Sequence, residues 1–327
     1  MHTRQWPKWW KRLRPLLLAA ALSLSLGMTA STALAVPQGG YAHPEALLQP
    51  EELKARLDQK DSALKIIDVR HDVKYYLGHI PGAVQVWRHD LEIKKPAASG
   101  LPLAAAQLEK LMGRLGISTR DTVVLYSDQF DHTWLWWLLA YYGFPLERLK
   151  ILDGGLEAWK AKGYPTQLTS PRLKRASFKL PQDRRVDSLL ATLQDLKSAI
   201  RQPGKVVLDD RTQRQYLGEE REEGAARAGR IPGAVWVEWK ETRVSEGPYK
   251  SYFKPAPQIK ELYAAQGVTP DKDIYLYSRM GLKAAHSLVS LYLAGFPLEK
   301  LHLYAGSWTE WSHSKEAIET GQPRSGK

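Results

Sequence analysis

One segment of the sequence combines the residue types that bind a small anion, namely Ser278-Arg279-Met280-Gly281-Leu282-Lys283. It separates an apolar segment expected to be a strand, 273–277, from one with helical spacing of apolar residues, 284–293. Such a loop can turn several backbone N–H groups toward a ligand at the positive end of the helix dipole. Arg279 and Lys283 would add full charges at its rim. The sequence therefore predicts an anion-binding cradle here, the alternative being an ordinary turn with Ser278 near the helix N-cap.

The chemistry open to this loop is limited because the chain has no cysteine. A thiolate nucleophile, a disulfide and a cysteine-ligated metal are all excluded. Ser278 could attack a substrate only if a base took its proton, and His286, eight residues further on, is a weak candidate better explained by packing. The nine histidines are scattered without metal-ligand spacing, so neither a metal site nor a cofactor is predicted.

The elements that must position the loop occur twice. Residues 78–84 recur at 229–235, and 143–147 recur at 295–299. The shift between the copies grows from 141 to 151 near residues 219–228, so the second copy contains a ten-residue insertion there. Its acidic run, 219–223, is interpreted as a solvated insertion, with a lid or docking element as the alternative. Ordered matches of this kind indicate a tandem duplication.

Each copy alternates short apolar strands with helical segments, which is typical of an α/β fold with a parallel sheet covered by helices on both faces. The first copy is assigned to residues 43–167 and the second to 186–313. A segment rich in lysine and arginine, 171–185, is interpreted as the linker, and the polar tail, 314–327, is predicted to be disordered.

The first 35 residues have the order of a signal peptide, with a basic start, an apolar run at 16–26 and Ala33-Leu34-Ala35 as the cleavage site. The chain is therefore predicted to be exported, periplasmic or secreted, with no integral membrane segment after cleavage; an uncleaved anchor is the alternative. The remaining 42 basic and 35 acidic residues leave a charge of +7. That excess does not argue for a nucleic-acid partner and fits small anions or an anionic membrane surface equally well.

The ordered motifs resemble those of the tandem rhodaneses, the thiosulfate and 3-mercaptopyruvate sulfurtransferases. They are the duplication itself, an Asp-x-Arg turn followed by Tyr-x-Gly, the Gly-His-Ile-Pro-Gly-Ala segment and the closing Gly-Ser-Trp-x-Glu-Trp. The resemblance spans residues 43–312 and implies two rhodanese-like α/β domains, each with a five-stranded parallel sheet, of which only the second carries the active-site loop.

In that family the second domain's loop, C-x-x-G-x-[RTK], holds a cysteine that carries sulfur as a persulfide. The resemblance places Ser278 at the cysteine, residues 279–283 at the substrate cradle and Arg211 at a substrate-orienting arginine. The basic residues of the loop are more similar to the thiosulfate type. Two departures are Gln215, where the family has a second arginine, and Ala305, where it usually has aspartate. The adjacent Arg214 is the alternative candidate for the second arginine's role.

Three functions follow as hypotheses. The favoured one is a catalytically impaired protein that binds a small oxyanion such as thiosulfate, or a partner protein, at the cradle. The second is sulfur transfer by a route that needs no cysteine. The third is a serine-nucleophile hydrolase acting through Ser278. A hydroxyl stays protonated at physiological pH and cannot hold a persulfide, which is why the first is favoured.

Overall fold

The computed structural model describes residues 39–91, 93, 101–181, 183–246 and 251–323. The predicted signal peptide, 1–35, lies outside them. Within these ranges no helix has the length and apolar character needed to cross a membrane, and no group of three or more metal-ligating side chains gathers.

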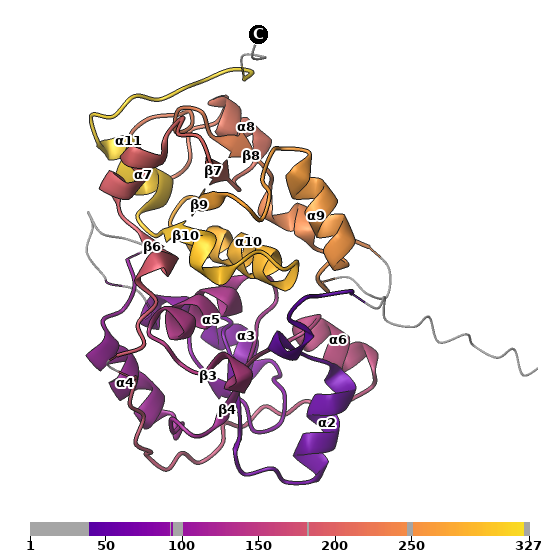
Figure 1. Ribbon diagram of the computed structural model, residues 1–327. Coiled ribbons are helices and arrows are strands. Elements are labelled where there is room, and N and C mark those ends of the chain that lie inside the picture. The colour runs from indigo at the N-terminus through magenta and orange to yellow at the C-terminus, as the bar shows by residue number, and fades with distance from the viewer. Residues whose placement is uncertain (1–38, 92, 94–100, 182, 247–250, 324–327) are drawn as a thin grey trace, which may run out of the picture. The chain divides into compact units, whose positions relative to one another are not determined.

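The first copy folds as a five-stranded parallel sheet (Figure 1). Its strands, in the spatial order β1-β5-β4-β2-β3, are β1 (Leu47–Leu48), β5 (Leu149–Leu152), β4 (Thr122–Tyr126), β2 (Leu64–Asp68) and β3 (Val84–Gln85). The helices of this copy are α2 (Pro50–Asp58), α3 (Asp72–Tyr76), α4 (Ala105–Arg114), α5 (Asp131–Tyr141) and α6 (Gly155–Ala161). Short 3-10 turns are η2 (Pro44–Ala46), η3 (Arg88–Asp90) and η5 (Leu146–Arg148).

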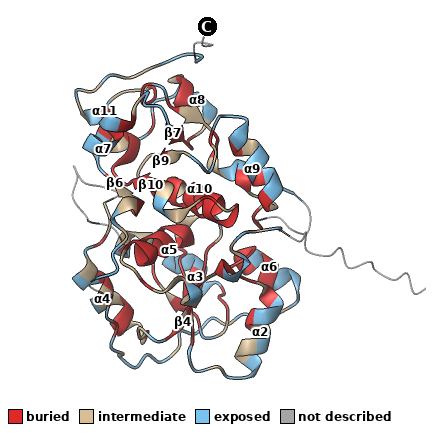
Figure 2. Cartoon of the chain, in the orientation of Figure 1, coloured by how far each residue is buried: buried red, intermediate tan, exposed pale blue. Residues whose placement is uncertain are grey.

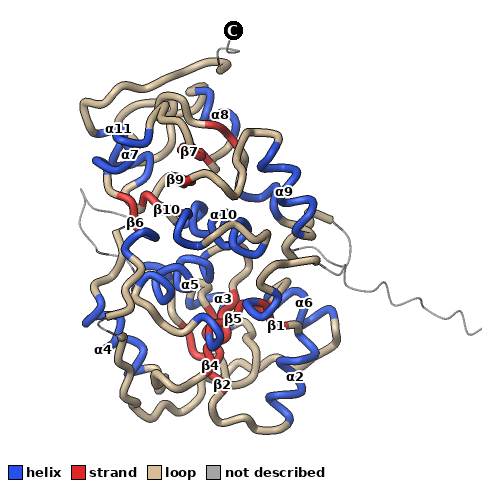
Figure 3. The backbone as a smooth tube through the Cα atoms, viewed as in Figure 1, coloured by secondary structure: helices blue, strands red, loops and turns tan. Residues whose placement is uncertain are grey.

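The second copy repeats this architecture in the order β6-β10-β9-β7-β8. Its strands are β6 (Leu190–Ala191), β10 (Leu301–Tyr304), β9 (Asp273–Tyr277), β7 (Lys205–Asp209) and β8 (Val235–Trp236). Its helices are α7 (Leu193–Ala199), α8 (Gln213–Leu217), α9 (Ala256–Ala264), α10 (Leu282–Leu293) and α11 (Ser307–His313). Its 3-10 turns are η6 (Asp187–Leu189), η7 (Trp239–Thr242) and η8 (Leu298–Lys300). The predicted α/β fold and its duplication are confirmed. Figure 3 separates strands from helices in both copies.

Along the central strands, successive apolar side chains point to opposite faces of the sheet. Both faces are therefore apolar, which explains why helices cover both. In β4, Val123 points into one apolar core and Val124 into another. In β9, Ile274 shares the core of Val123, whereas Tyr275 belongs to a third. The core common to both sheets contains α5 and α10, which pack against each other and are buried almost throughout (Figure 2). A helix that is apolar all round is stable only in such an interior position.

Two segments expected to be irregular are held in place. In the predicted linker, 171–185, Phe178 and Leu180 are buried, and the Ala176 N–H donates to the Gly113 carbonyl. In the predicted disordered tail, residues 314–323 are ordered instead, because Glu319 exchanges backbone hydrogen bonds with Arg230.

Two ion pairs between side chains also hold this tail against the second copy. Glu316 pairs with Lys197 at 2.7 Å, and Glu319 pairs with Arg201 at 2.7 Å. These are contacts between residues far apart in the chain. Because the tail has no apolar periodicity, its sequence does not predict these contacts.

Candidate functional site

The loop predicted to be a cradle lies between β9 and α10, and its backbone is held by the turn that precedes α11. The Ser278 N–H donates to Ser307 Oγ at 3.2 Å, and the Trp308 N–H donates to the Ser278 carbonyl at 2.9 Å. The Arg279 carbonyl accepts from both the N–H and the hydroxyl of Thr309, at 3.0 and 2.9 Å. The closing Gly-Ser-Trp motif therefore positions the loop, and Ser278 is buried with 1% of its surface exposed.

Gly281 ends the loop in a left-handed conformation, with φ +82°, and is the N-cap of α10. A Cβ atom at this position would lie 3.0 Å from the Trp134 ring and 3.2 Å from the Ala305 carbonyl oxygen. Glycine is needed here for both its backbone freedom and its lack of a side chain.

We expect Gly281→Ala to lower the free energy of unfolding by about 2 kcal/mol, since it adds steric contact to an unfavourable φ. Urea denaturation measures this loss. Gly224→Ala is the matched control, because Gly224 has φ +80° and nothing within 4 Å of the added Cβ. Equal losses in the two variants would contradict a contribution from the contacts with Trp134 and Ala305.

A cavity of about 240 Å³ opens at the loop. It brings together five of the predicted residues, namely Ser278, Arg279, Met280, Leu282 and Lys283. Gly281 shapes the loop without lining the cavity. The wall also includes three residues that the sequence analysis did not assign to a site, Arg88, Phe130 and Glu222. Arg88 and Phe130 come from the first copy, so both copies build this cavity.

Glu222, from the inserted segment, brings a negative charge to the cradle. Its side chain is 8% exposed; Oε1 lies 4.0 Å from Arg279 Nε, and Oε2 lies 3.8 Å from Arg211 Nη1. Burial raises the pKa of Glu222, while Arg211, Lys283 and Arg279 oppose that rise. The sequence predicts a solvated insertion, but this one carboxylate is buried beside the basic groups on which an anion would depend. In the sequence the insertion follows the Asp-x-Arg turn, but nothing there indicates which of its carboxylates is buried.

Arg211 is fully buried in a network of its own. Its Nε and Nη2 donate to the Asp209 carboxylate, at 3.0 and 2.6 Å, and Nη2 also donates to the Gly229 carbonyl at 2.7 Å. Tyr277 donates its hydroxyl to the same carboxylate at 2.6 Å. Arg211 does not line the cavity and meets it only through Glu222. Its predicted role in substrate binding stays a prediction.

The first copy contains the same network. Arg70 donates to Asp68 and to the Gly78 carbonyl, and Tyr126 donates to Asp68. A network that recurs in the copy without a basic loop indicates that the Asp-x-Arg turn has a structural function in both. Arg214, the neighbour of Gln215, is 69% exposed and faces Glu220 at 3.8 Å, away from the cavity.

No histidine is among the residues that line this cavity. His286 Nε2 contacts Thr242 Oγ1 at 3.1 Å, its ring stacks on Phe253, and burial holds its pKa well below the usual range. A direct serine–histidine hydrogen bond occurs instead in the first copy, where Ser127 Oγ lies 2.7 Å from His132 Nδ1. Burial lowers the pKa of His132 to about 3, which makes it a poor general base. Neither His286 nor His132 therefore supplies a base for Ser278.

Comparison with known proteins identifies the repeated unit. The model for the rhodanese-like domain matches residues 49–162 and again 192–314. A sulfur carrier protein, TtuD, of Thermus thermophilus is 33% identical over 84% of this chain and 96% of its own length. A thiosulfate sulfurtransferase of Corynebacterium glutamicum is 32% identical over 86% of this chain and 93% of its own length.

The fold matches a solved structure as well. The anaerobic ergothioneine biosynthesis enzyme of Chlorobium limicola, in complex with trimethyl histidine, superposes with a TM-score of 0.76. The match covers 86% of this chain and 72% of that enzyme, at 22% identity. At that identity the likeness concerns the fold.

Proposed function

This chain belongs to the rhodanese family, as a tandem member without cysteine, and we propose that it binds a small sulfur oxyanion such as thiosulfate at residues 278–283 without turning it over. The observation that carries the proposal is the cavity in which Ser278, Arg279 and Lys283 meet at the N-terminus of α10. Basic side chains at a helix N-terminus favour an anion. Names such as thiosulfate sulfurtransferase among the relatives support the sulfur oxyanion as the ligand.

With serine in place of the cysteine, the site can bind thiosulfate but cannot take up its sulfur as a persulfide. In a rhodanese reaction the cysteine thiolate attacks the outer sulfur of thiosulfate, the S–S bond breaks, and sulfite leaves with its electron pair. A serine hydroxyl keeps its proton at neutral pH and forms no persulfide. Sulfur transfer by a route without cysteine is the alternative, and turnover by the native chain would support it.

Calorimetric titration of the purified chain with thiosulfate, sulfate and phosphate tests the binding. We expect saturable heat with thiosulfate and a dissociation constant about tenfold higher in Lys283→Ala, because a charge-assisted contact is lost. A native chain without saturable heat for any of the three anions would overturn the proposal.

Glu222 sets the pH dependence of this binding. Its raised pKa means that the side chain takes up a proton as the pH falls from neutral, which removes the negative charge beside Arg279. Thiosulfate affinity should therefore rise on acidification. Glu222→Gln should bind about tenfold more tightly at pH 7, by the Coulomb energy of a charge several ångströms away.

Titrations of both chains across the acidic range check this. Glu220→Gln is the matched control, since Glu220 belongs to the same insertion and does not line the cavity. Equal affinity of the native and Glu222→Gln chains at every pH would contradict a role for this carboxylate.

Export is proposed from the sequence of the first 35 residues. The test is N-terminal sequencing of the protein recovered from the periplasm or medium of an expressing bacterium. A new N-terminus after Ala35 supports cleavage, and an intact Met1 in the membrane fraction supports the anchor.

A further inference from the structure

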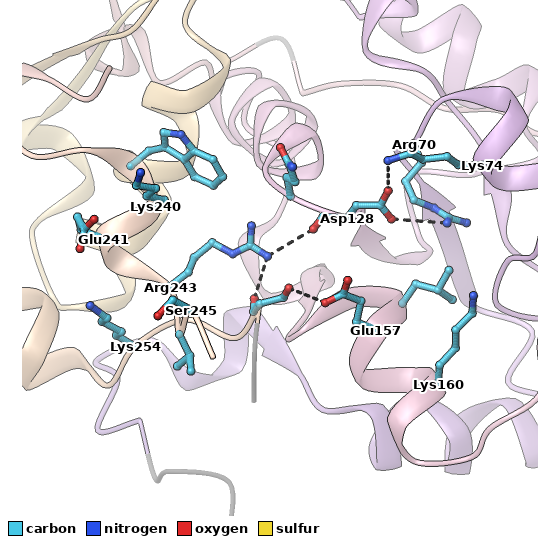
Figure 4. Close-up of a pocket in the computed structure, with 15 residues that line it drawn as sticks. Arg70, Lys74, Asp128, Glu157, Lys160, Lys240, Glu241, Arg243, Ser245 and Lys254 are labelled. Atoms are coloured by element: carbon cyan, nitrogen blue, oxygen red, sulfur yellow. Dashed lines mark hydrogen bonds and ion pairs between the residues drawn. The ribbon is translucent and has the colours of Figure 1, made fainter. Parts of the chain in front are cut away.

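A second cavity, of about 600 Å³, lies away from Ser278, where the first copy meets the second (Figure 4). Its first-copy wall includes Asp128 and Gln129, from the loop between β4 and α5. That loop corresponds to residues 278–283 by the internal repeat. The second-copy wall includes Trp239 and Lys240, which correspond to Arg88 and His89. Part of its wall thus corresponds, by the internal repeat, to the wall of the cavity at Ser278.

Cations outnumber carboxylates in this wall. Six basic side chains line it, Arg70, Lys74, Lys160, Lys240, Arg243 and Lys254. Three acidic side chains do so, Asp128, Glu157 and Glu241. Asp128 already faces both Arg70, at 3.6 Å, and Lys74. Glu157 accepts a hydrogen bond from the Ser251 hydroxyl at 3.0 Å.

Three of the cations keep their charge unpaired. In the part of the chain that the structure describes, no carboxylate lies within ion-pair distance of Lys160, Arg243 or Lys254. Lys160 comes from α6 of the first copy, whereas the other two come from the second. An anion in the cavity would therefore be held from two opposite walls.

Of the three unpaired cations, Arg243 is the one that a bound anion would stabilise most. Its Nη2 reaches only two backbone carbonyls, of Asp128 and Ser251, both at 3.4 Å and so near the outer limit of hydrogen bonding. Its guanidinium lies 5.7 Å from the centre of the Trp239 ring. Burial lowers the pKa of Arg243, which reflects the cost of a desolvated charge without a close counter-ion.

We propose that this cavity binds a small polyanion with at least two anionic groups, held by Arg243 and Lys254 from the second copy and by Lys160 from the first. Its volume exceeds what one small oxyanion fills, and a fork-shaped guanidinium suits phosphate or carboxylate groups. Oligophosphates and tricarboxylates share this chemistry. The site is separate from the cradle at Ser278 and does not depend on its function.

Calorimetric titration of the full chain with inorganic tripolyphosphate, and separately with citrate, tests the proposal. We expect saturable 1:1 binding of at least one of them, and the stronger binder identifies the class of anionic group. Arg243→Gln should raise its dissociation constant about tenfold. Lys160→Gln/Lys254→Gln, which changes no paired side chain, should do the same and keeps the test valid if Arg243→Gln misfolds.

Lys283→Gln is the matched control, because it removes a cation from the other cavity. Unchanged polyanion binding in this variant supports the assignment. Two results would overturn it: no saturable heat with either probe, or binding that is lost in Lys283→Gln but kept in Lys160→Gln/Lys254→Gln.

Discussion

Replacing Ser278 with cysteine should yield thiosulfate-to-cyanide sulfur transfer at least about 100-fold above that of the native chain, because the variant gains the thiolate that the reaction requires. The native backbone already holds the position through Ser307 and Trp308. Serine and cysteine differ little in size, so the loop should accept the sulfur.

The surroundings of the new thiol favour its ionised form. The loop precedes the N-terminus of α10, and Arg279 and Lys283 line the same cavity. Helix N-termini and neighbouring cations lower a cysteine pKa from about 8.5 into or below the neutral range. The negative charge of Glu222, in contrast, would raise the pKa of the thiol. The double variant Ser278→Cys/Glu222→Gln should therefore be the more active of the two.

Ser127→Cys is the matched control. It places a cysteine at the corresponding point of the first copy, where the side chain contacts His132 and where Asp128 and His132 replace Arg279 and Lys283. We expect no sulfur transfer from it. The assay is cyanide-dependent thiocyanate formation, with mass spectrometry for a persulfide adduct of 32 Da, about the mass of one sulfur atom. An active native chain would contradict binding without turnover, and an inactive but folded Ser278→Cys would contradict the assignment of the cradle.

Arg211→Met should lower the free energy of unfolding by about 3 to 5 kcal/mol, which is the usual loss when one partner of a buried ion pair is removed. Asp209 would stay buried, with Tyr277 as its remaining side-chain partner. Denaturant unfolding followed by tryptophan fluorescence measures the loss. This is the largest loss of stability that we expect from a single substitution in the second copy.

Arg70→Met is the comparison that separates structure from binding. Arg70 makes the same contacts in the first copy, far from Ser278 in sequence, and should destabilise the chain by a similar amount. If Arg211 acts mainly in the fold, thiosulfate affinity of the folded fraction will be unchanged in both variants. A stable Arg211→Met chain that no longer binds thiosulfate would instead assign Arg211 to the ligand.

Much of the architecture follows from local patterns in the sequence. The repeated motifs at 78–84 and 229–235 imply two copies of one unit, and the alternation of apolar strands and helices implies parallel sheets. Residues 278–283 could be singled out because a loop between a strand and a helix brings its own side chains together. All of these are relations between near neighbours in the chain or between nearly identical repeats.

The tertiary structure alone decided which distant residues complete the site. Arg88 and Phe130 reach the cavity only because α5 and α10 pack together and join the two copies. Glu222 enters it because the insertion folds inward beside Arg211, and Arg243 meets Asp128 across the two copies. Such contacts join residues many positions apart, and their geometry depends on how whole sheets pack. No periodicity or spacing in the sequence predicts how the sheets pack. The charge balance of both cavities could therefore be established only from the folded chain.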